Sequence, residues 1–295
     1  STGLSASGAG PILAFEGLNT GLSPNTSIIT VIPELTFNGT TCDGPSQTFT
    51  ITVNPLLDIN PLGDIDICDG ETMPLISFGS NLVGSIVNYS WTNDNNSIGL
   101  ASSGSGDISP FSVFNSGSTL QTATITVTAS HTNAGQTCDS TETFLISVSS
   151  SPVATIIGIN NFVLCEGDTD PVITFEGSNG TAPYTFTYSI NSDPDQIVSS
   201  GTLTTATVSI STANFGLNTI TLKGVSDSST PTSCTSTNIT SPNQAFVDVQ
   251  QQGTILPQNL NIVSQTLCEG TPIDPIVFDI GGSADAAFVT GLPSG

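Results

Sequence analysis

The sequence predicts an all-β fold in which β-sandwich domains follow one another in tandem and form an extended array. Apolar residues occur in short alternating runs rich in Ile, Val, Thr and Phe, the pattern of half-buried strands. No stretch keeps an apolar period of 3.6 residues, so few helices are expected. The chain also repeats itself. Gly3 and Cys42 match Gly99 and Cys138 at a constant offset of 96 residues, which is typical of a domain array.

The expected strands recur in one architecture. In the first full repeat they are residues 74–79, 86–91, 110–115, 122–129 and 143–148; in the second, 172–177, 184–190, 205–211, 218–224 and 245–250; in the incomplete repeats, 48–55, 255–263 and 275–282. Short strands with turn signals about every 8–12 residues, in units of about 95 residues, favour immunoglobulin-like sandwiches. Trp91, the only tryptophan, ends one of these strands and is expected in a core.

The repeat divides the chain into four parts. Residues 1–55 correspond to the C-terminal half of a repeat, 56–151 and 152–252 to two complete repeats, and 253–295 to the N-terminal half of another. Because residue 1 falls inside a repeat, we expect the sequence to be a piece of a longer chain.

The charge balance argues against two classes of partner. The chain has 24 acidic residues, a single Lys or Arg and a net charge of -23. Nucleic acids and anionic lipid surfaces both attract proteins through Lys and Arg, so neither is an expected partner. No stretch approaches the roughly 20 apolar residues of a membrane span, so no membrane insertion of this segment is expected.

The sequence offers little for catalysis, and no enzyme activity is expected. A nucleophile or general base needs a partner beside it, and the chain has one His and one Lys. His131 lies in a turn, and Lys223 ends an expected strand as an edge or surface residue. A glycosidase carboxylate pair is conceivable, but no two acids stand out.

Six cysteines alternate between two positions in the repeat. Early cysteines lie in a Cys-Asp/Glu-Gly sequence before the first strong strand, and late cysteines lie before the final strand; they are Cys68, Cys165 and Cys268, and Cys42, Cys138 and Cys234. The spacing is not CxxC, so zinc is not expected. Regular cysteines in an acidic β-rich chain indicate disulfides and an extracellular location.

Two sets of disulfides are consistent with this spacing. We favour bridges within repeats, Cys68–Cys138 and Cys165–Cys234, with Cys42 and Cys268 paired outside the 295 residues. Each closed loop of about 70 residues would stabilise its domain by roughly 4 kcal/mol. The alternative set joins consecutive repeats and stays open: Cys42–Cys68, Cys138–Cys165 and Cys234–Cys268.

Calcium is the one cofactor that the sequence suggests. Carboxylates crowd the start of the first full repeat, at Asp58, Asp64, Asp66, Asp69 and Glu71, and Asp193 and Asp195 lie together in the second. Hard oxygen ligands at a domain junction suit calcium, although the spacing matches no EF-hand loop. The simpler interpretation is a solvated acidic loop.

Several segments resemble a known family. IGLASSGSGDISPFSVFN (98–115) followed by TATITVTA and TFLISV is similar to the PKD-like, immunoglobulin-like repeats of very large Bacteroidota surface proteins. These include the gliding-motility adhesins of the SprB type, which the type IX secretion system exports. The resemblance implies a filament on the surface of a Gram-negative bacterium. One departure is that TNDNNS follows Trp91, where PKD domains carry a WDFGDG-like motif.

Three functions remain in view. The first is a structural spacer in a giant surface adhesin, with other repeats of the same chain and an unidentified surface or glycan as partners. The second is a set of carbohydrate- or protein-binding modules of a secreted enzyme, which would expose clustered aromatics. The third is a fibre subunit that exchanges strands.

Overall fold

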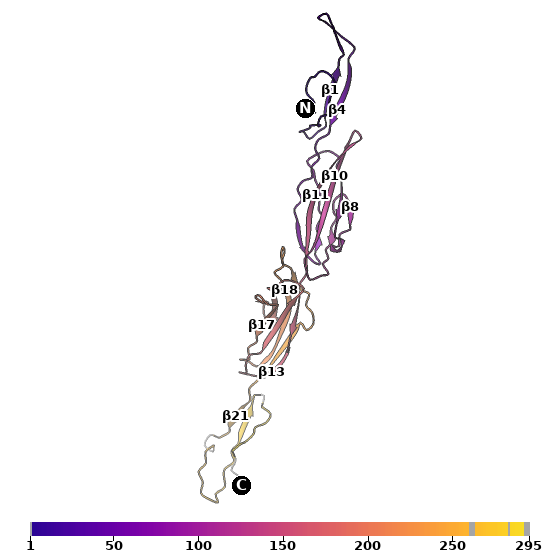
Figure 1. Cartoon of the computed structure of the whole chain (residues 1–295). Coiled ribbons are helices and arrows are strands. Elements are labelled where there is room, and N and C mark those ends of the chain that lie inside the picture. Colours follow the sequence, from indigo (N-terminus) through magenta and orange to yellow (C-terminus); the bar gives the residue numbers. More distant parts are fainter. Residues whose placement is uncertain (1, 260–262, 283, 292–295) are drawn as a thin grey trace. The chain divides into compact units, whose positions relative to one another are not determined.

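The computed structural model describes all residues except 1, 260–262, 283 and 292–295. Its regular elements are strands, and the one helix among the described residues is a single 3-10 turn, η1 (Asn96–Ile98) (Figure 1). Contacts divide the chain into two units, Ser1–Ser149 and Ser150–Gly295. Each unit contains one complete sandwich and a smaller two-stranded part. The expected half-repeat 253–295 contains every undescribed position but the first, and the three expected boundaries between the four parts stay predictions.

The first sandwich, residues 57–149, is built on a five-stranded sheet in the order β5-β11-β10-β7-β8. A smaller layer, β6 with β9 and the bridges Ile59–Ser80 and Ile76–Ile108, supplies the opposite wall of the core. The strands are β5 (Ile65–Cys68), β6 (Thr72–Met73), β7 (Asn88–Asn93), β8 (Ser103–Ser105), β9 (Phe111–Ser112), β10 (Gln121–Asn133) and β11 (Gln136–Ser149).

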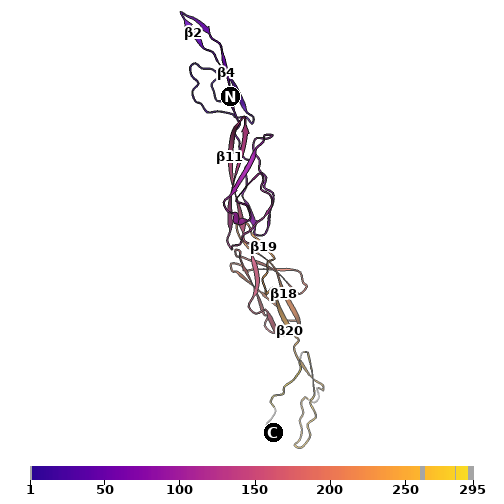
Figure 2. The same cartoon turned by 90° about the vertical axis from the view of Figure 1, so that its right-hand side faces the viewer.

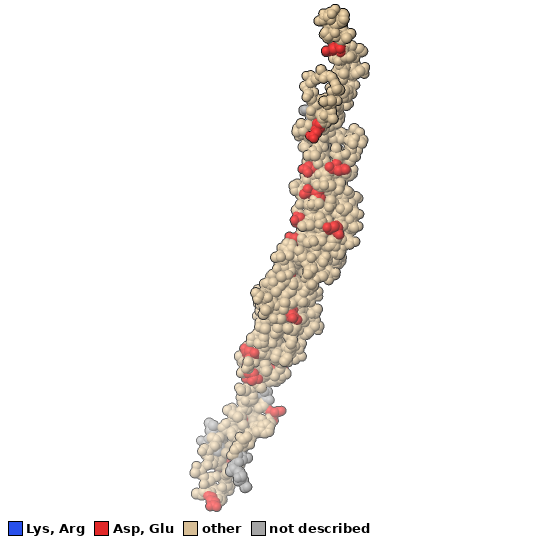
Figure 3. Space-filling model, viewed as in Figure 1, with Lys and Arg blue, Asp and Glu red and all other residues tan. Residues whose placement is uncertain are grey.

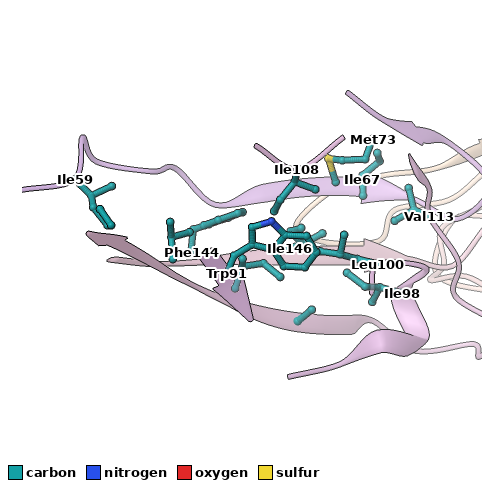
Figure 4. Close-up of a cluster of buried hydrophobic side chains, with 14 of the residues drawn as sticks. Ile59, Ile67, Met73, Trp91, Ile98, Leu100, Ile108, Val113, Phe144 and Ile146 are labelled. Atoms are coloured by element: carbon teal, nitrogen blue, oxygen red, sulfur yellow. The ribbon is translucent and has the colours of Figure 1, made fainter. Parts of the chain in front are cut away.

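The core of this sandwich follows from side-chain alternation. Every second residue of β10 from Ala123 to Ala129 is buried, and the threonines between them face outward. Trp91 from β7 lies in the middle of the cluster, with Ile108, Phe144 and Ile146 around it (Figure 4). The expected core position of Trp91 is confirmed. Burying each large apolar side chain contributes about 1.5–3 kcal/mol.

The second sandwich, residues 153–250, has two fuller layers. One is a three-stranded sheet in the order β12-β14-β17, and the other runs β13-β20-β18-β15-β16 with β19 beside β18. Figure 2 shows β18 and β20 side by side. The strands are β12 (Val153–Ile157), β13 (Asn161–Cys165), β14 (Val172–Ser178), β15 (Thr185–Ile190), β16 (Gln196–Ser199), β17 (Thr205–Ser209), β18 (Gly216–Ser226), β19 (Thr235–Ser236) and β20 (Gln244–Gln250).

Both sandwiches share one feature of topology. The strand that ends at the early cysteine pairs in parallel with the last strand of the same sandwich: β5 with β11, and β13 with β20. All other pairings within the two large sheets are antiparallel. The predicted all-β, immunoglobulin-like sandwich fold is therefore confirmed, and both copies have the same strand arrangement in their larger sheet.

The ends of the described chain form only two-stranded pieces. These are β1 (Asn25–Val31) with β4 (Gln47–Val53), β2 (Glu34–Phe37) with β3 (Thr40–Asp43), and β21 (Thr254–Pro257) with β22 (Phe278–Gly281). Apolar side chains on them stay exposed, including Phe37 at 73% and Leu256 at 67%. The two buried hydrophobic clusters lie within residues 57–148 and 154–249.

Most expected strands overlap observed ones, with two kinds of exception. Residues 74–79 form no strand; Ile76 alone bridges Ile108, and Pro74 has no N–H to contribute to a ladder. Conversely, several short strands were not expected, among them β5, β12 and β13. Lys223 lies on the inner strand β18, where the pairing with β15 shifts register, and forms an exposed ion pair with Asp195. It is thus a surface residue, but not an edge residue.

We predict that Gly104→Ala destabilises the first sandwich by about 1–3 kcal/mol through overpacking. A Cβ at Gly104 would lie 2.2 Å from Cζ2 of Trp91. Gly63→Ala is the matched control, because nothing lies within 4 Å of its added Cβ. Denaturant unfolding followed by the fluorescence of Trp91, the only tryptophan, measures this sandwich directly. Equal midpoints for the two variants would contradict the packing argument.

Candidate functional site at the cysteine-bearing ends of the domains

One end of the first sandwich is formed by the turn between β10 and β11. Near this turn, Cys138 on β11 lies opposite His131 on β10. The turn residue Asn133 donates a hydrogen bond from its Nδ2 to Oδ1 of Asn54, at 2.7 Å. Asn54 lies where the chain approaches the sandwich. We call this the leading end, because the chain enters there, and it carries the late cysteine.

The opposite end carries the early cysteine. Cys68 is the last residue of β5 and lies beside Ser149, the last residue of β11. The chain leaves the sandwich here, so we call it the trailing end. Ser149 lies eleven positions after Cys138 in β11, which is about 36 Å at about 3.3 Å per residue. A disulfide requires Cα atoms within about 7 Å, so Cys68 and Cys138 cannot be bridged.

The second sandwich repeats this arrangement. At its trailing end, Cys165 lies beside Gln250, the last residue of β20. At its leading end, the backbone N–H of Asp227 donates to the carbonyl of Cys234 at 3.0 Å, just beyond β18. The length of β18 separates the two ends, about 30 Å for its 11 residues. Cys165 and Cys234 therefore cannot pair within this sandwich either.

The cysteine states correct the predicted pairings. Cys68 and Cys234 are disulfide-bonded, whereas Cys42, Cys138, Cys165 and Cys268 are free thiols. Neither Cys68–Cys138 nor Cys165–Cys234 is present, and none of the three alternative bridges between consecutive repeats is present. The physical reason is the parallel pairing of an early strand with the last strand, which places the early cysteine at the trailing end. The pairing of Cys42 and Cys268 outside the sequence stays a prediction.

The surroundings of Cys234 are buried and contain a hydrogen-bonded carboxylate. Asp227 is only 5% exposed. Its carboxylate accepts hydrogen bonds from the backbone N–H groups of Cys234, at 2.8 Å, and Thr181, at 3.1 Å, and from the Ser229 hydroxyl. Burial, followed by the nearby Asp227 charge, raises the pKa of the Tyr184 phenol, and a backbone hydrogen bond from Gly180 opposes this shift. Sequence reasoning missed Asp227, because the groups that donate to it come together only when the chain folds.

The surroundings of the early cysteines are a recurring tight turn. The third residue after the cysteine donates its backbone N–H to the cysteine carbonyl. The N–O distance is 3.2 Å between Glu71 and Cys68 and 3.0 Å between Asp168 and Cys165. Its side chain accepts the cysteine N–H in return. The intervening glycine, Gly70 or Gly167, has a positive φ, which favours glycine. The motif Cys-Asp/Glu-Gly thus encodes a turn that holds the trailing end.

The acids suggested as calcium ligands serve separate backbone groups. Asp64 accepts the N–H of Leu145 at 2.8 Å, Asp69 accepts that of Asn115 at 2.8 Å, and Glu71 accepts that of Cys68. Asp58 and Asp66 are not drawn into one cluster with them. Within the described part of the chain, no three His, Cys, Asp or Glu side chains form a group that could hold a metal.

The remaining candidates are also dispersed. Asp195 pairs with Lys223, while Asp193 lies in an exposed turn. His131 places its Nδ1 2.9 Å from the carbonyl of Ile86 on the surface. On the face shown in Figure 3, acidic side chains are scattered in small separate groups. Among the described residues, no helix is long and apolar enough to cross a bilayer.

Comparisons with known proteins give distant likenesses. No protein-family model and no curated protein sequence matches the chain. Among solved structures, the ICAM-5 D1–D4 ectodomain fragment has 8% identity and a TM-score of 0.32, covering 80% of this chain and 64% of that one. A calcium-stabilised adhesin with which an Antarctic bacterium binds ice has 14% identity and a TM-score of 0.29, covering 77% and 59%. Fibronectin(III)-like modules of Clostridium thermocellum CbhA have 13% identity and a TM-score of 0.28, covering 66% and 95%. Likenesses this distant carry no argument about function.

We predict that Asp227→Ala destabilises the second sandwich by about 2–3 kcal/mol, because it leaves buried N–H groups without a charged acceptor. Asp193→Ala, in an exposed turn, should change stability by less than about 0.5 kcal/mol. Calorimetry of both variants measures the difference, with Tyr184 and Tyr188 as optical reporters of this sandwich. Similar melting of the two variants would show that the buried carboxylate is dispensable.

We also predict that millimolar calcium leaves the melting temperature of the first sandwich unchanged, because a ligand stabilises a fold only by binding it. Trp91 fluorescence during heating, with calcium or with EDTA, measures this. Magnesium at the same concentration controls for ionic strength. A rise with calcium alone would restore the acidic-loop site.

Proposed function

We propose that this chain is a non-catalytic structural segment of a long adhesin on the surface of a Gram-negative bacterium. Within that proposal, the most specific form is a SprB-type gliding-motility adhesin of the Bacteroidota, exported by type IX secretion. The observation that carries it is the repetition of one sandwich, with the same strand arrangement and the same placement of cysteines at its two ends.

The topology supports a role in transmitting tension. In the first sandwich the chain enters at the leading end and leaves at the trailing end. Tension on the chain pulls the parallel strands β5 and β11 past each other along their length. Their hydrogen bonds then share the load together and do not open one at a time. The same parallel pairing occurs between β13 and β20.

The surface chemistry supports a spacer more than a binding module. The aromatic side chains of the two sandwiches lie largely in the cores, where Phe175 packs against Phe186 and Tyr188. With one cationic side chain, the chain is poorly suited to nucleic acid or anionic lipid. The proposed partners are other repeats of the same protein, while a separate part of it binds a surface or glycan.

Labelling and shortening the native protein on intact cells tests the proposal. An epitope inserted at the exposed Ala134–Gly135 turn should bind antibody without permeabilisation. In-frame deletion of residues 56–151, one whole repeat, should leave surface display intact and reduce the reach of adhesion. Epitope found only inside the cell would overturn the proposal.

Competition distinguishes a spacer from a binding module. Purified chain added to cells should not inhibit their adhesion, because a spacer does not occupy the target surface. Inhibition that saturates with concentration would instead assign ligand binding to these sandwiches.

A further inference from the structure

The free thiols of Cys138 and Cys165 are each equivalent to a bonded cysteine elsewhere in the chain. Cys165 has the trailing-end position of Cys68, beside the last strand and in the same Cys-x-Gly-acid turn. Cys138 has the leading-end position of Cys234, where the chain enters a sandwich. Cys68 and Cys234 are disulfide-bonded. Cys138, in the same sandwich as Cys68, and Cys165, in the same sandwich as Cys234, are free thiols.

We propose that Cys138 and Cys165 form disulfides with cysteines of neighbouring domains. Cys138 pairs with the trailing-end, Cys-x-Gly cysteine of the domain before its sandwich. Cys165 pairs with the leading-end cysteine of the domain after its sandwich. Each complete sandwich would then carry one bridge at each end and none inside.

Geometry excludes the competing partners within a sandwich. The estimated separations of about 36 Å and 30 Å, between Cys138 and Cys68 and between Cys165 and Cys234, are several times the reach of a disulfide. Cys42 does not fit as the partner of Cys138, because the proposed bridges join an early cysteine to a late one. Cys42 is a late cysteine that occupies the same hairpin position as Cys138 in its own repeat. Cys42 faces Leu35 as Cys138 faces His131, in each case around a turn with a positive-φ glycine.

Both thiols are accessible for oxidation. Cys165 is exposed and Cys138 is half-buried, so a reagent or a second protein can reach them. Each bridge forms by thiol–disulfide exchange with an oxidised dithiol protein or a low-molecular-weight disulfide. The two cysteines lose two protons and two electrons, and the donor disulfide is reduced to two thiols.

The bridges rest on the proposed function for their mechanical role and for the further repeats that supply the two partner cysteines. A disulfide across a junction runs in parallel with the peptide linker, so the linker cannot be pulled out further than the bridge allows. Cellular location and disulfide mapping are separate measurements, so failure of the surface assignment would leave the mapping result intact.

Disulfide mapping of the full-length protein from its native cells tests the proposal. Free thiols are first blocked with N-ethylmaleimide under acidic, denaturing conditions that stop exchange. Digestion uses proteases specific for Asp and Glu, because the chain has one Lys and no Arg. Mass spectrometry should find the Cys138 peptide linked to a Cys-x-Gly peptide from the domain before residue 56. The Cys165 peptide should be linked to a peptide that carries a leading-end cysteine from the domain after residue 252.

Two results would overturn the proposal. One is recovery of Cys138 and Cys165 as maleimide adducts in protein from cells, which would make them free thiols. The other is a Cys68–Cys138, Cys165–Cys234 or Cys138–Cys165 link.

Single variants provide an independent readout. Cys138→Ser should leave the Trp91 unfolding transition of its sandwich unchanged and expose one new thiol in the domain before it. Cys165→Ser should expose one in the domain after its sandwich. Loss of stability without a newly reactive thiol would indicate a packing role for the side chain and contradict the bridge.

Discussion

The parallel pairing between an early strand and the last strand of each sandwich is the constraint on which the other features depend. It places β5 at the edge of the larger sheet of the first sandwich, beside β11, and β13 at the edge of the larger sheet of the second, beside β20. It also directs the chain to enter a sandwich at one end and leave at the other. The early cysteine and its turn then lie beside the departing strand, while the hairpin or loop with the late cysteine lies at the opposite end. Cysteine placement is thus a consequence of strand direction.

Much of the fold could be predicted from residue patterns, because strand alternation and turn residues act locally. The Ala, Ile and Val series of β10 and the core position of Trp91 are examples. The short strands β5 and β13 could not be found in the same way. Each has four or five residues, and its direction is set by a partner about 80 residues away in sequence. With that direction unknown, a separation of about 70 residues between cysteines suggested a loop closure that the sheet does not allow.

The acidic residues around Cys68 show a related limit of prediction from sequence. Counting carboxylates near one another in sequence suggested a calcium site. In the fold, Asp64, Asp69 and Glu71 each accept a different backbone N–H. Buried or half-buried N–H groups need acceptors as much as metals need ligands. In a chain with so few cations, backbone amides are the main donors left to carboxylates. Asp227 is the fullest example, with two amides and a hydroxyl.

The position of Lys223 has a consequence for cleavage by proteases. Proteases specific for Lys or Arg have this single residue to recognise in the 295. It lies within β18, between β15 and β20, and Asp195 holds its ammonium group. A protease must draw several extended residues into its cleft, so cleavage there requires β18 to leave the sheet first. Resistance to trypsin-like enzymes is therefore set by the unfolding of the second sandwich.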